Sequence, residues 1–144
     1  MNGFTRKILF VIVTCYILGF FAHALYLRKT VYGDGIFYYS WVRSIVIDHD
    51  IHFANDYTHF GVAQPSTRFG TPGNKYSIGP ALFWAPLYIS THTWIRGDGW
   101  TLPYQLAAGF TSTCAAIAGL ILLLRLLGPS TAASLTVLLI AGAT

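Results

Sequence analysis

Apolar residues are gathered into four long runs, and this pattern predicts helices that cross a membrane. The first run, residues 8–27, has the length of about 20 residues that a helix needs to cross a hydrocarbon core. Further runs cover residues 78–95 and 104–127, and a fourth occupies residues 131–144. We therefore expect an all-α fold: a polytopic membrane helix bundle, with residues 1–144 as the N-terminal part of a multi-pass transmembrane domain.

The last apolar run is too short to cross a bilayer. Its residues, 131–144, would form about 21 Å of helix, whereas a hydrocarbon core is about 30 Å thick. We therefore expect the sequence to be a fragment, the N-terminal portion of a longer protein. The alternative is a short protein that ends in a half-span.

The composition also favours a membrane protein. Hydrophobic residues make up 54% of the chain and charged residues only 10%, whereas soluble domains carry about 25% charged residues. The basic residues flank apolar segments, where they would meet lipid phosphates, so we expect no nucleic-acid partner. Cys15 and Cys114 lie inside apolar runs, where a thiol behaves as a small hydrophobic group.

Charges around the first run predict its orientation. Arg6 and Lys7 precede it, so we expect a cell-membrane protein with a cytoplasmic N-terminus and an extracytoplasmic loop at residues 28–77. The basic residues in that loop argue weakly against this orientation. They could instead hold an anionic headgroup.

The outer loop contains four of the five acidic residues of the chain. Residues 36–47 have the spacing of an amphipathic helix at the membrane surface, and Asp34 stands where its N-cap belongs. Arg43 falls on one row of this helix, and the membrane-facing row would hold Tyr38, Trp41, Val42, Ile45 and Val46. Read alone, the Gly-Asp-Gly turn favours a simple helix cap as the role of Asp34.

Asp48 and Asp50 flank His49 at the far end of the expected helix. A D-x-D pair could bind a divalent cation, and a solvated loop is the alternative. Fourteen helical residues separate Asp34 from Asp48, about 21 Å, so these acids would be separate features. We expect the loop histidines, His49, His52 and His59, to be exposed.

Two stretches carry a resemblance to a known family. "GDGIFYYSWVRSIVIDHDIHF" resembles the first outer loop of the GT-C class of polytopic glycosyltransferases, which includes protein mannosyltransferases and lipid A aminoarabinose transferases. "TPGNKYSIGPALFWAPLY" resembles the entry into the next helix of that family. The resemblance extends over about residues 6–127. It implies a membrane enzyme that moves a sugar from a polyprenyl-phosphate donor to an acceptor hydroxyl.

The resemblance also implies roles for particular residues. Asp34 matches the catalytic first-loop carboxylate of the family, although Gly35 stands where a Glu usually follows. Asp48 and Asp50 match a second acidic position. Any metal requirement stays unknown, with a divalent cation as one option.

The chemistry of sugar transfer agrees with this assignment. The acceptor hydroxyl needs a base, and the leaving phosphate needs cations at headgroup height. Arg43, Lys75 and Arg28 are candidates for the donor phosphate, and snorkelling is the alternative for Lys75. A single displacement would invert the anomeric centre.

A non-catalytic reading also fits the sequence. The chain could be a multi-pass scaffold or subunit whose loop docks a partner chain, and an active enzyme could need further C-terminal helices.

Overall fold

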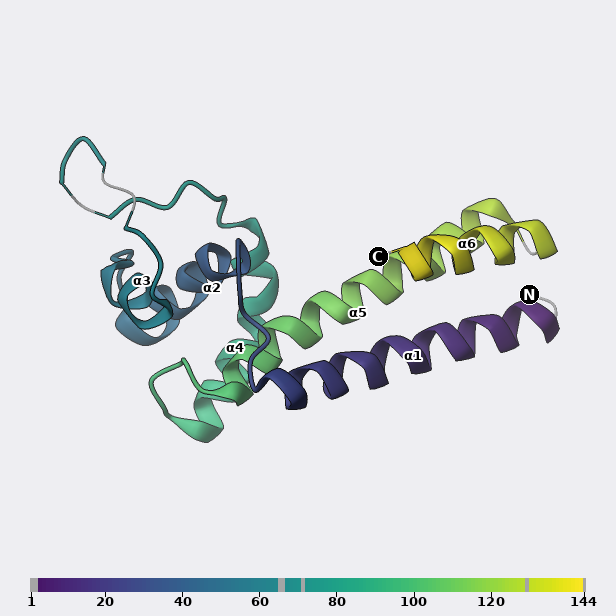
Figure 1. Cartoon of the computed structure of the whole chain (residues 1–144), viewed down its shortest axis with the longest axis horizontal. Coiled ribbons are helices and arrows are strands. Elements are labelled where there is room, and N and C mark those ends of the chain that lie inside the picture. The colour runs from purple at the N-terminus through teal and green to yellow at the C-terminus, as the bar shows by residue number, and fades with distance from the viewer. Residues whose placement is uncertain (1–2, 65–66, 71, 129, 144) are drawn as a thin grey trace. The chain divides into compact units, whose positions relative to one another are not determined.

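The computed structural model describes residues 3–64, 67–70, 72–128 and 130–143, and the regular elements within them are helices (Figure 1). The chain divides into two compact units. Unit 1 comprises Met1–Tyr26 and Ser112–Thr144, and unit 2 comprises Leu27–Thr111. The expected all-α class is confirmed for the described residues.

Unit 1 contains α1 (Gly3–Leu27), α6 (Thr131–Ala143) and the C-terminal part of α5 (Leu102–Leu127). Its core is a small aliphatic cluster of Ile12, Leu120, Leu124, Ala133 and Val137. Hydroxyl groups also join α1 to α6. Thr5 Oγ1 lies 2.9 Å from Ser134 Oγ, and Tyr16 Oη donates to the carbonyl oxygen of Ala141.

Two of the helices, α1 and α5, are long and apolar enough to cross a membrane. Only 11% of the most apolar window of α1 and 17% of that of α5 is buried, so most of their apolar side chains face outward. The apolar runs at residues 78–95 and 131–144 also form helices, α4 (Gly79–Ile95) and α6, but these have 17 and 13 residues.

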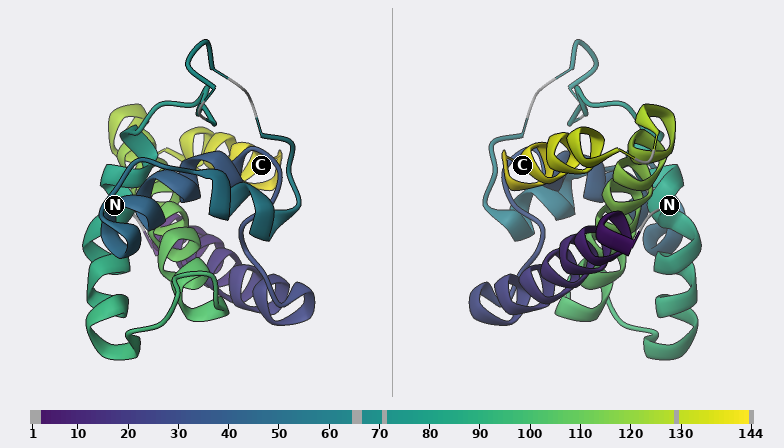
Figure 2. Two further views of the ribbon diagram at one scale, coloured as in Figure 1. Left: turned by 90° about the vertical axis from the view of Figure 1, so that its left-hand side faces the viewer. Right: turned by 90° about the vertical axis from the view of Figure 1, so that its right-hand side faces the viewer.

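Unit 2 is built from short helices. The expected helix at residues 36–47 is present as α2 (Gly35–Arg43) followed directly by a π-helical turn, η1 (Ser44–Asp48). α2 packs against α4 (Figure 2). The sequence pattern did not predict α3 (Ala54–Phe60), which is only 7 residues long.

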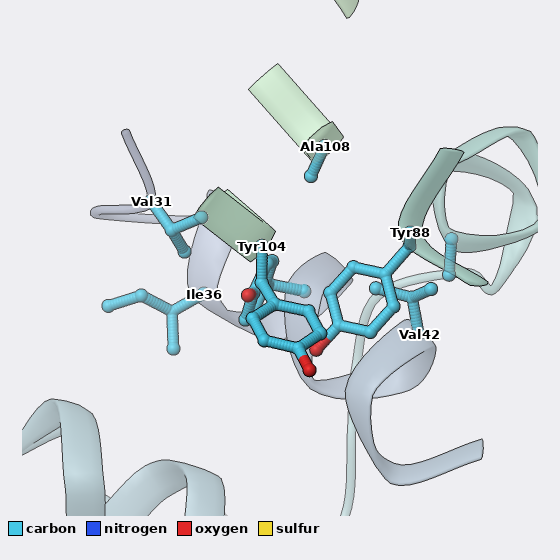
Figure 3. Close-up of a cluster of buried hydrophobic side chains, with 8 residues drawn as sticks. Val31, Ile36, Val42, Tyr88, Tyr104 and Ala108 are labelled. Atoms are coloured by element: carbon cyan, nitrogen blue, oxygen red, sulfur yellow. The ribbon is translucent and has the colours of Figure 1, made fainter. Parts of the chain in front are cut away.

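The core of unit 2 joins α2, α4, the start of α5 and the segment between α1 and α2. Figure 3 shows Val42, Tyr88 and Tyr104 pointing toward one another, and the rings of Tyr88 and Tyr104 lie 5.2 Å apart. The buried members of this cluster are Val31, Ile36, Tyr39, Val42, Ala81, Tyr88, Tyr104 and Ala108. Residues from the expected outer loop therefore share one core with α4 and α5.

The buried face of α2 differs from the one that the sequence pattern predicted. Arg43 and Ser40 are buried, whereas Tyr38 and Trp41 are half-buried and Ile45, in η1, is exposed. The pattern assigned the apolar face by residue type. Both polar residues are buried because their hydrogen bonds are satisfied, which removes the penalty of burial. Ser40 Oγ donates to the carbonyl of Ile36 one turn earlier in α2, and Arg43 is bound by carbonyl and carboxylate groups outside α2.

Candidate functional site

Asp34 lies at the start of α2, in a turn formed by the sequence Gly-Asp-Gly. Gly33 has a φ of 55°, which is a left-handed conformation that glycine adopts without steric strain. The backbone amide of Gly35 bonds to the carbonyl of Tyr32, and that of Phe37 bonds to the carbonyl of Asp34. Asp34 occupies the N-cap position as expected, but its carboxylate makes no capping hydrogen bond and the residue is exposed.

The carboxylate of Asp34 instead meets Tyr76, from the segment that leads into α4. The hydrogen bond between them is the main reason why the pKa of Tyr76 is raised to about 12. Because Asp34 accepts this bond, removing the phenolic proton would place two negative charges side by side.

Tyr76 is held in place by an aromatic cluster and by polar contacts with α2. Its ring stacks on Phe37 at 5.1 Å and meets Tyr38 edge-on at 5.0 Å. Its carbonyl accepts from the indole of Trp41, and its backbone amide donates to Asn74, whose side chain in turn bonds to the carbonyl of Phe37. The neighbour of Asp34 is thus fixed by several independent contacts.

Lys75 adds a positive charge to the same surface. Its Nζ atom lies 5.0 Å from the ring centroid of Tyr76 and 5.7 Å from that of Phe37. Lys75 is exposed, so its ammonium group is accessible from solvent. Asp34 and Lys75 therefore share Tyr76 as a common neighbour, although they are far apart in the sequence. We call these three residues the Asp34 site.

Arg43, a candidate for binding the donor phosphate, is buried with 3% exposure. Its Nη1 atom lies 2.6 Å from Asp48 Oδ2 and 3.5 Å from Asp56 Oδ1, and its Nε donates to the carbonyl of Asp98. The guanidinium also covers the ring of Trp100 at 3.9 Å. These groups already occupy the face with which Arg43 would bind an anion.

Asp56 completes this buried centre. Its Oδ1 accepts from the indole N–H of Trp100 at 3.0 Å, and its Oδ2 accepts from Ser44 Oγ at 3.0 Å. Burial raises the pKa of Asp56 above its ordinary value of 3.8, although Trp100, Arg43 and Ser44 oppose this shift. We call Arg43, Asp48, Asp56 and Trp100 the Arg43 centre.

The structure directs Asp48 and Asp50 to different partners. Asp48 accepts from Arg43 and from Asn55 Nδ2, at 2.7 Å, whereas Asp50 Oδ1 accepts the backbone N–H of His52. Within the described part of the chain, no three His, Cys, Asp or Glu residues are grouped as metal ligands. The carboxylates of the D-x-D pair therefore do not converge in this arrangement.

Two other expected residues remain at the surface. Arg28 directly follows α1, is exposed and has a φ of 54°. His59 is exposed as expected, and its ring also stacks on Trp100 at 4.3 Å.

Sequence reasoning overlooked the segment between α4 and α5, which supplies Trp100 to the Arg43 centre and the carbonyl of Asp98 that accepts from Arg43. No role was predicted for the residues between the apolar runs at 78–95 and 104–127. One signal was present, because "GDG" occurs twice, at residues 33–35 and 97–99. Asp56 was also not singled out, since nothing in its neighbourhood distinguishes it from an exposed loop acid.

Comparison of the chain with protein-family models, with curated proteins and with solved structures found no match. The geometry of the two sites is therefore the basis for any functional conclusion.

Proposed function

We propose that this protein is a membrane glycosyltransferase that transfers a sugar from a polyprenyl-phosphate donor to an acceptor hydroxyl. One observation carries the proposal. Asp34 is exposed and bonds to Tyr76, whose ring also has Lys75 as a neighbour, whereas Asp48 and Asp56 are engaged with Arg43. Asp34 is thus a carboxylate at an accessible surface that also carries a cation and aromatic rings.

In this proposal Asp34 acts as the general base. It takes the proton of the acceptor hydroxyl as the hydroxyl oxygen attacks the anomeric carbon. The bond between that carbon and the phosphate oxygen breaks, and the lipid phosphate leaves with the electron pair. One displacement of this kind inverts the anomeric centre. Tyr76 holds the Asp34 carboxylate in position through their hydrogen bond.

Lys75 and Arg28 bind the donor phosphate in this proposal, because both are exposed cations. Positive charge near the leaving group stabilises the negative charge that develops on it. Arg43 acts as a positioning residue instead, since two carboxylates and a carbonyl already surround its guanidinium. The proposal needs no metal at Asp48 and Asp50.

The membrane part of the proposal assigns α1 and α5 to the bilayer. Their length and their outward-facing apolar side chains support this assignment. A cytoplasmic N-terminus follows from Arg6 and Lys7 by the positive-inside rule, and it puts unit 2 at the extracytoplasmic surface. A lipid-anchored donor would then reach Asp34 from the bilayer.

The proposal is tested by sugar transfer in membranes that contain the protein. Radiolabelled polyprenyl-phosphate mannose, glucose and aminoarabinose would serve as donors. Asp34→Asn should lower transfer by about 10²-fold or more, which is the typical contribution of a general base. His52→Gln, an exposed change in the same loop, is the matched control. Full transfer by the Asn variant would exclude Asp34 as the base.

A photoreactive polyprenyl-phosphate sugar separates this function from a non-catalytic scaffold. If the protein is the proposed enzyme, the probe should label peptides from residues 28–77, and unlabelled donor should reduce this labelling. A scaffold whose loop docks a partner chain should show neither effect.

A further inference from the structure

α4 has apolar side chains on two opposite faces. One face, with Ala81 and Tyr88, is buried in the core of unit 2. The opposite face is uncovered, and its residues, Leu82, Phe83, Pro86, Leu87 and Trp94, are exposed in the structure. These positions recur at the spacing of one helical face. Exposure of a contiguous apolar face to water is unfavourable, so we expect an apolar partner to cover this face.

The segments before and after α4 contact neighbouring residues of α2. On one side, the indole of Trp41 donates to the carbonyl of Tyr76, three residues before α4 begins. On the other side, Tyr39 Oη donates to the carbonyl of Gly99, four residues after α4 ends. Tyr39 and Trp41 are two residues apart in one helix, so their side chains cannot reach opposite surfaces of a hydrocarbon core about 30 Å thick.

The segment that follows α1 contacts the start of α5 at this same place. Thr30, just after α1, donates from its backbone N–H to Gln105 Oε1 and from Oγ1 to the Gln105 carbonyl. Gln105 lies in the first turns of α5, and its Nε2 donates to the carbonyl of Trp100. The end of α1, the connector after α4 and the start of α5 are therefore on one side of any bilayer that α1 and α5 cross.

We propose that α4 does not cross the membrane, and that its uncovered face docks onto the lipid surface from the side where α1 ends. Residues 28–101 then form one insertion between two spans, α1 and α5. Charge supports this placement. If α4 crossed the bilayer, its contacts with α2 would draw the Arg43 centre into hydrocarbon, where ionised side chains are strongly disfavoured.

The lipid surface is the partner that fits this face. The face ends in Trp94, at 88% exposure, next to the exposed Arg96. Tryptophan and arginine are typical of the headgroup region, while Leu82, Phe83 and Leu87 suit the acyl boundary about 5–10 Å below it. α4 is also shorter than α1 and α5, at 17 residues.

Cysteine labelling tests the topology. In a background with Cys15→Ala and Cys114→Ala, single cysteines at Ala63, Thr101 and Leu127 would be exposed to a membrane-impermeant maleimide in vesicles of known orientation. These positions lie before α4, after α4 and at the end of α5, and all three are exposed. Ala63→Cys and Thr101→Cys should react from one side, and Leu127→Cys from the other.

Labelling of Ala63→Cys and Thr101→Cys from opposite sides would overturn the proposal, because α4 would then cross the bilayer. A depth measurement adds a second test that does not depend on vesicle orientation. A spin label at Leu87→Cys should be shallow, about 5–10 Å below the headgroups, whereas a label at Leu18→Cys in α1 should be near the bilayer centre. Equal depths at both positions would contradict the docking of α4.

The inference rests on the proposed crossing of α1 and α5, and not on sugar transfer. Carbonate extraction tests the membrane crossing separately from sugar transfer. Release of the protein from membranes by carbonate would show that α1 and α5 do not cross the bilayer. If Asp34→Asn kept full sugar transfer, the proposed topology would be unaffected.

Discussion

Asp48 lies against the guanidinium of Arg43, five residues earlier in the chain, with 2.6 Å between Asp48 Oδ2 and Arg43 Nη1. In a regular α-helix, residues five apart are separated by about 140° around the axis. The π-helical turn η1 pairs residues five apart in its hydrogen bonding, so it brings the two side chains to the same side. The turn thereby sets the geometry of the Arg43 centre.

Removal of the buried carboxylate should destabilise unit 2 strongly. Asp56→Ala leaves the indole of Trp100 without its carboxylate acceptor, takes one acceptor from Ser44 and removes one of the two carboxylates beside Arg43. We expect a loss of about 3–5 kcal/mol in the free energy of unfolding. Asp56→Asn keeps an acceptor for Trp100 and should lose about 1–3 kcal/mol. Denaturant unfolding of the detergent-solubilised protein measures both. Asp50→Asn, at an exposed site, should change stability by about 0.5 kcal/mol or less.

The raised pKa of Asp56 predicts an unusual dependence of stability on pH. In the unfolded chain this carboxyl ionises near 3.8, whereas burial keeps it protonated to a higher pH in the folded protein. Between these two pKa values the folded state binds more protons, so the contribution of Asp56 to stability falls as the pH rises. Thermal unfolding at several pH values, from 3.8 upward, would compare the wild type with Asp56→Asn. Identical pH profiles would contradict this prediction.

Gly99 is a position where a side chain should not be tolerated. Its φ is 84°, and a Cβ there would lie 2.5 Å from Tyr88 Oη and 3.0 Å from Arg43 Cγ. The left-handed backbone conformation alone should cost a non-glycine residue about 1–3 kcal/mol of stability, and the close contacts of its Cβ add to this loss. Gly99→Ala should therefore lower the unfolding temperature clearly. Gly35→Ala, in α2 with open space around it, is the control and should be neutral or slightly stabilising.

Asp34 should control the ionisation of Tyr76. Asp34→Asn removes the negative charge next to the phenol, so the pKa of Tyr76 should fall from about 12 toward its ordinary value of 10.0. NMR of ring-labelled tyrosine, with Tyr76→Phe to assign the signal, measures this change. An unaltered Tyr76 titration would show that the two side chains do not interact.

Alkaline pH should destabilise unit 2 through Tyr57. Burial raises the pKa of this phenol from 10.0 to about 12, and its Oη donates to the carbonyl of Gly73. The folded state therefore keeps the proton that the unfolded chain loses, and this contribution to stability declines as the pH rises from 10 through 12. Unfolding of Tyr57→Phe should show a weaker decline than unfolding of the wild type. Equal declines would contradict the assignment.

The helices were predictable where a local pattern dominates. The long apolar runs at residues 8–27 and 104–127 correspond to α1 and α5, and the 3.6-residue periodicity of residues 36–47 corresponds to α2 with η1. The position of Asp34 at the head of α2 also followed from local sequence. In each case the signal lies within one segment, so no distant contact was needed to read it.

The sites depended on contacts that no local pattern contains. Asp34 meets Tyr76 across 42 residues, and Trp100 meets Asp56 across 44. Sequence reasoning assigned Arg43 to the donor phosphate because a leaving phosphate needs cations and Arg43 lies in the expected outer loop. Its burial depends on Asp48, Asp56 and the carbonyl of Asp98, which together replace the water that a lone arginine would require.

The sequence by itself determined the helical class, the long apolar segments and the residues that carry charge, because these follow from composition and short-range periodicity. Only the tertiary structure decided which charges are neutralised inside unit 2 and which remain accessible. It also decided that the segments flanking α4 both contact α2. The physical reason is that burial and ion pairing depend on segments far apart in the chain, and a sequence pattern does not encode which of these segments meet.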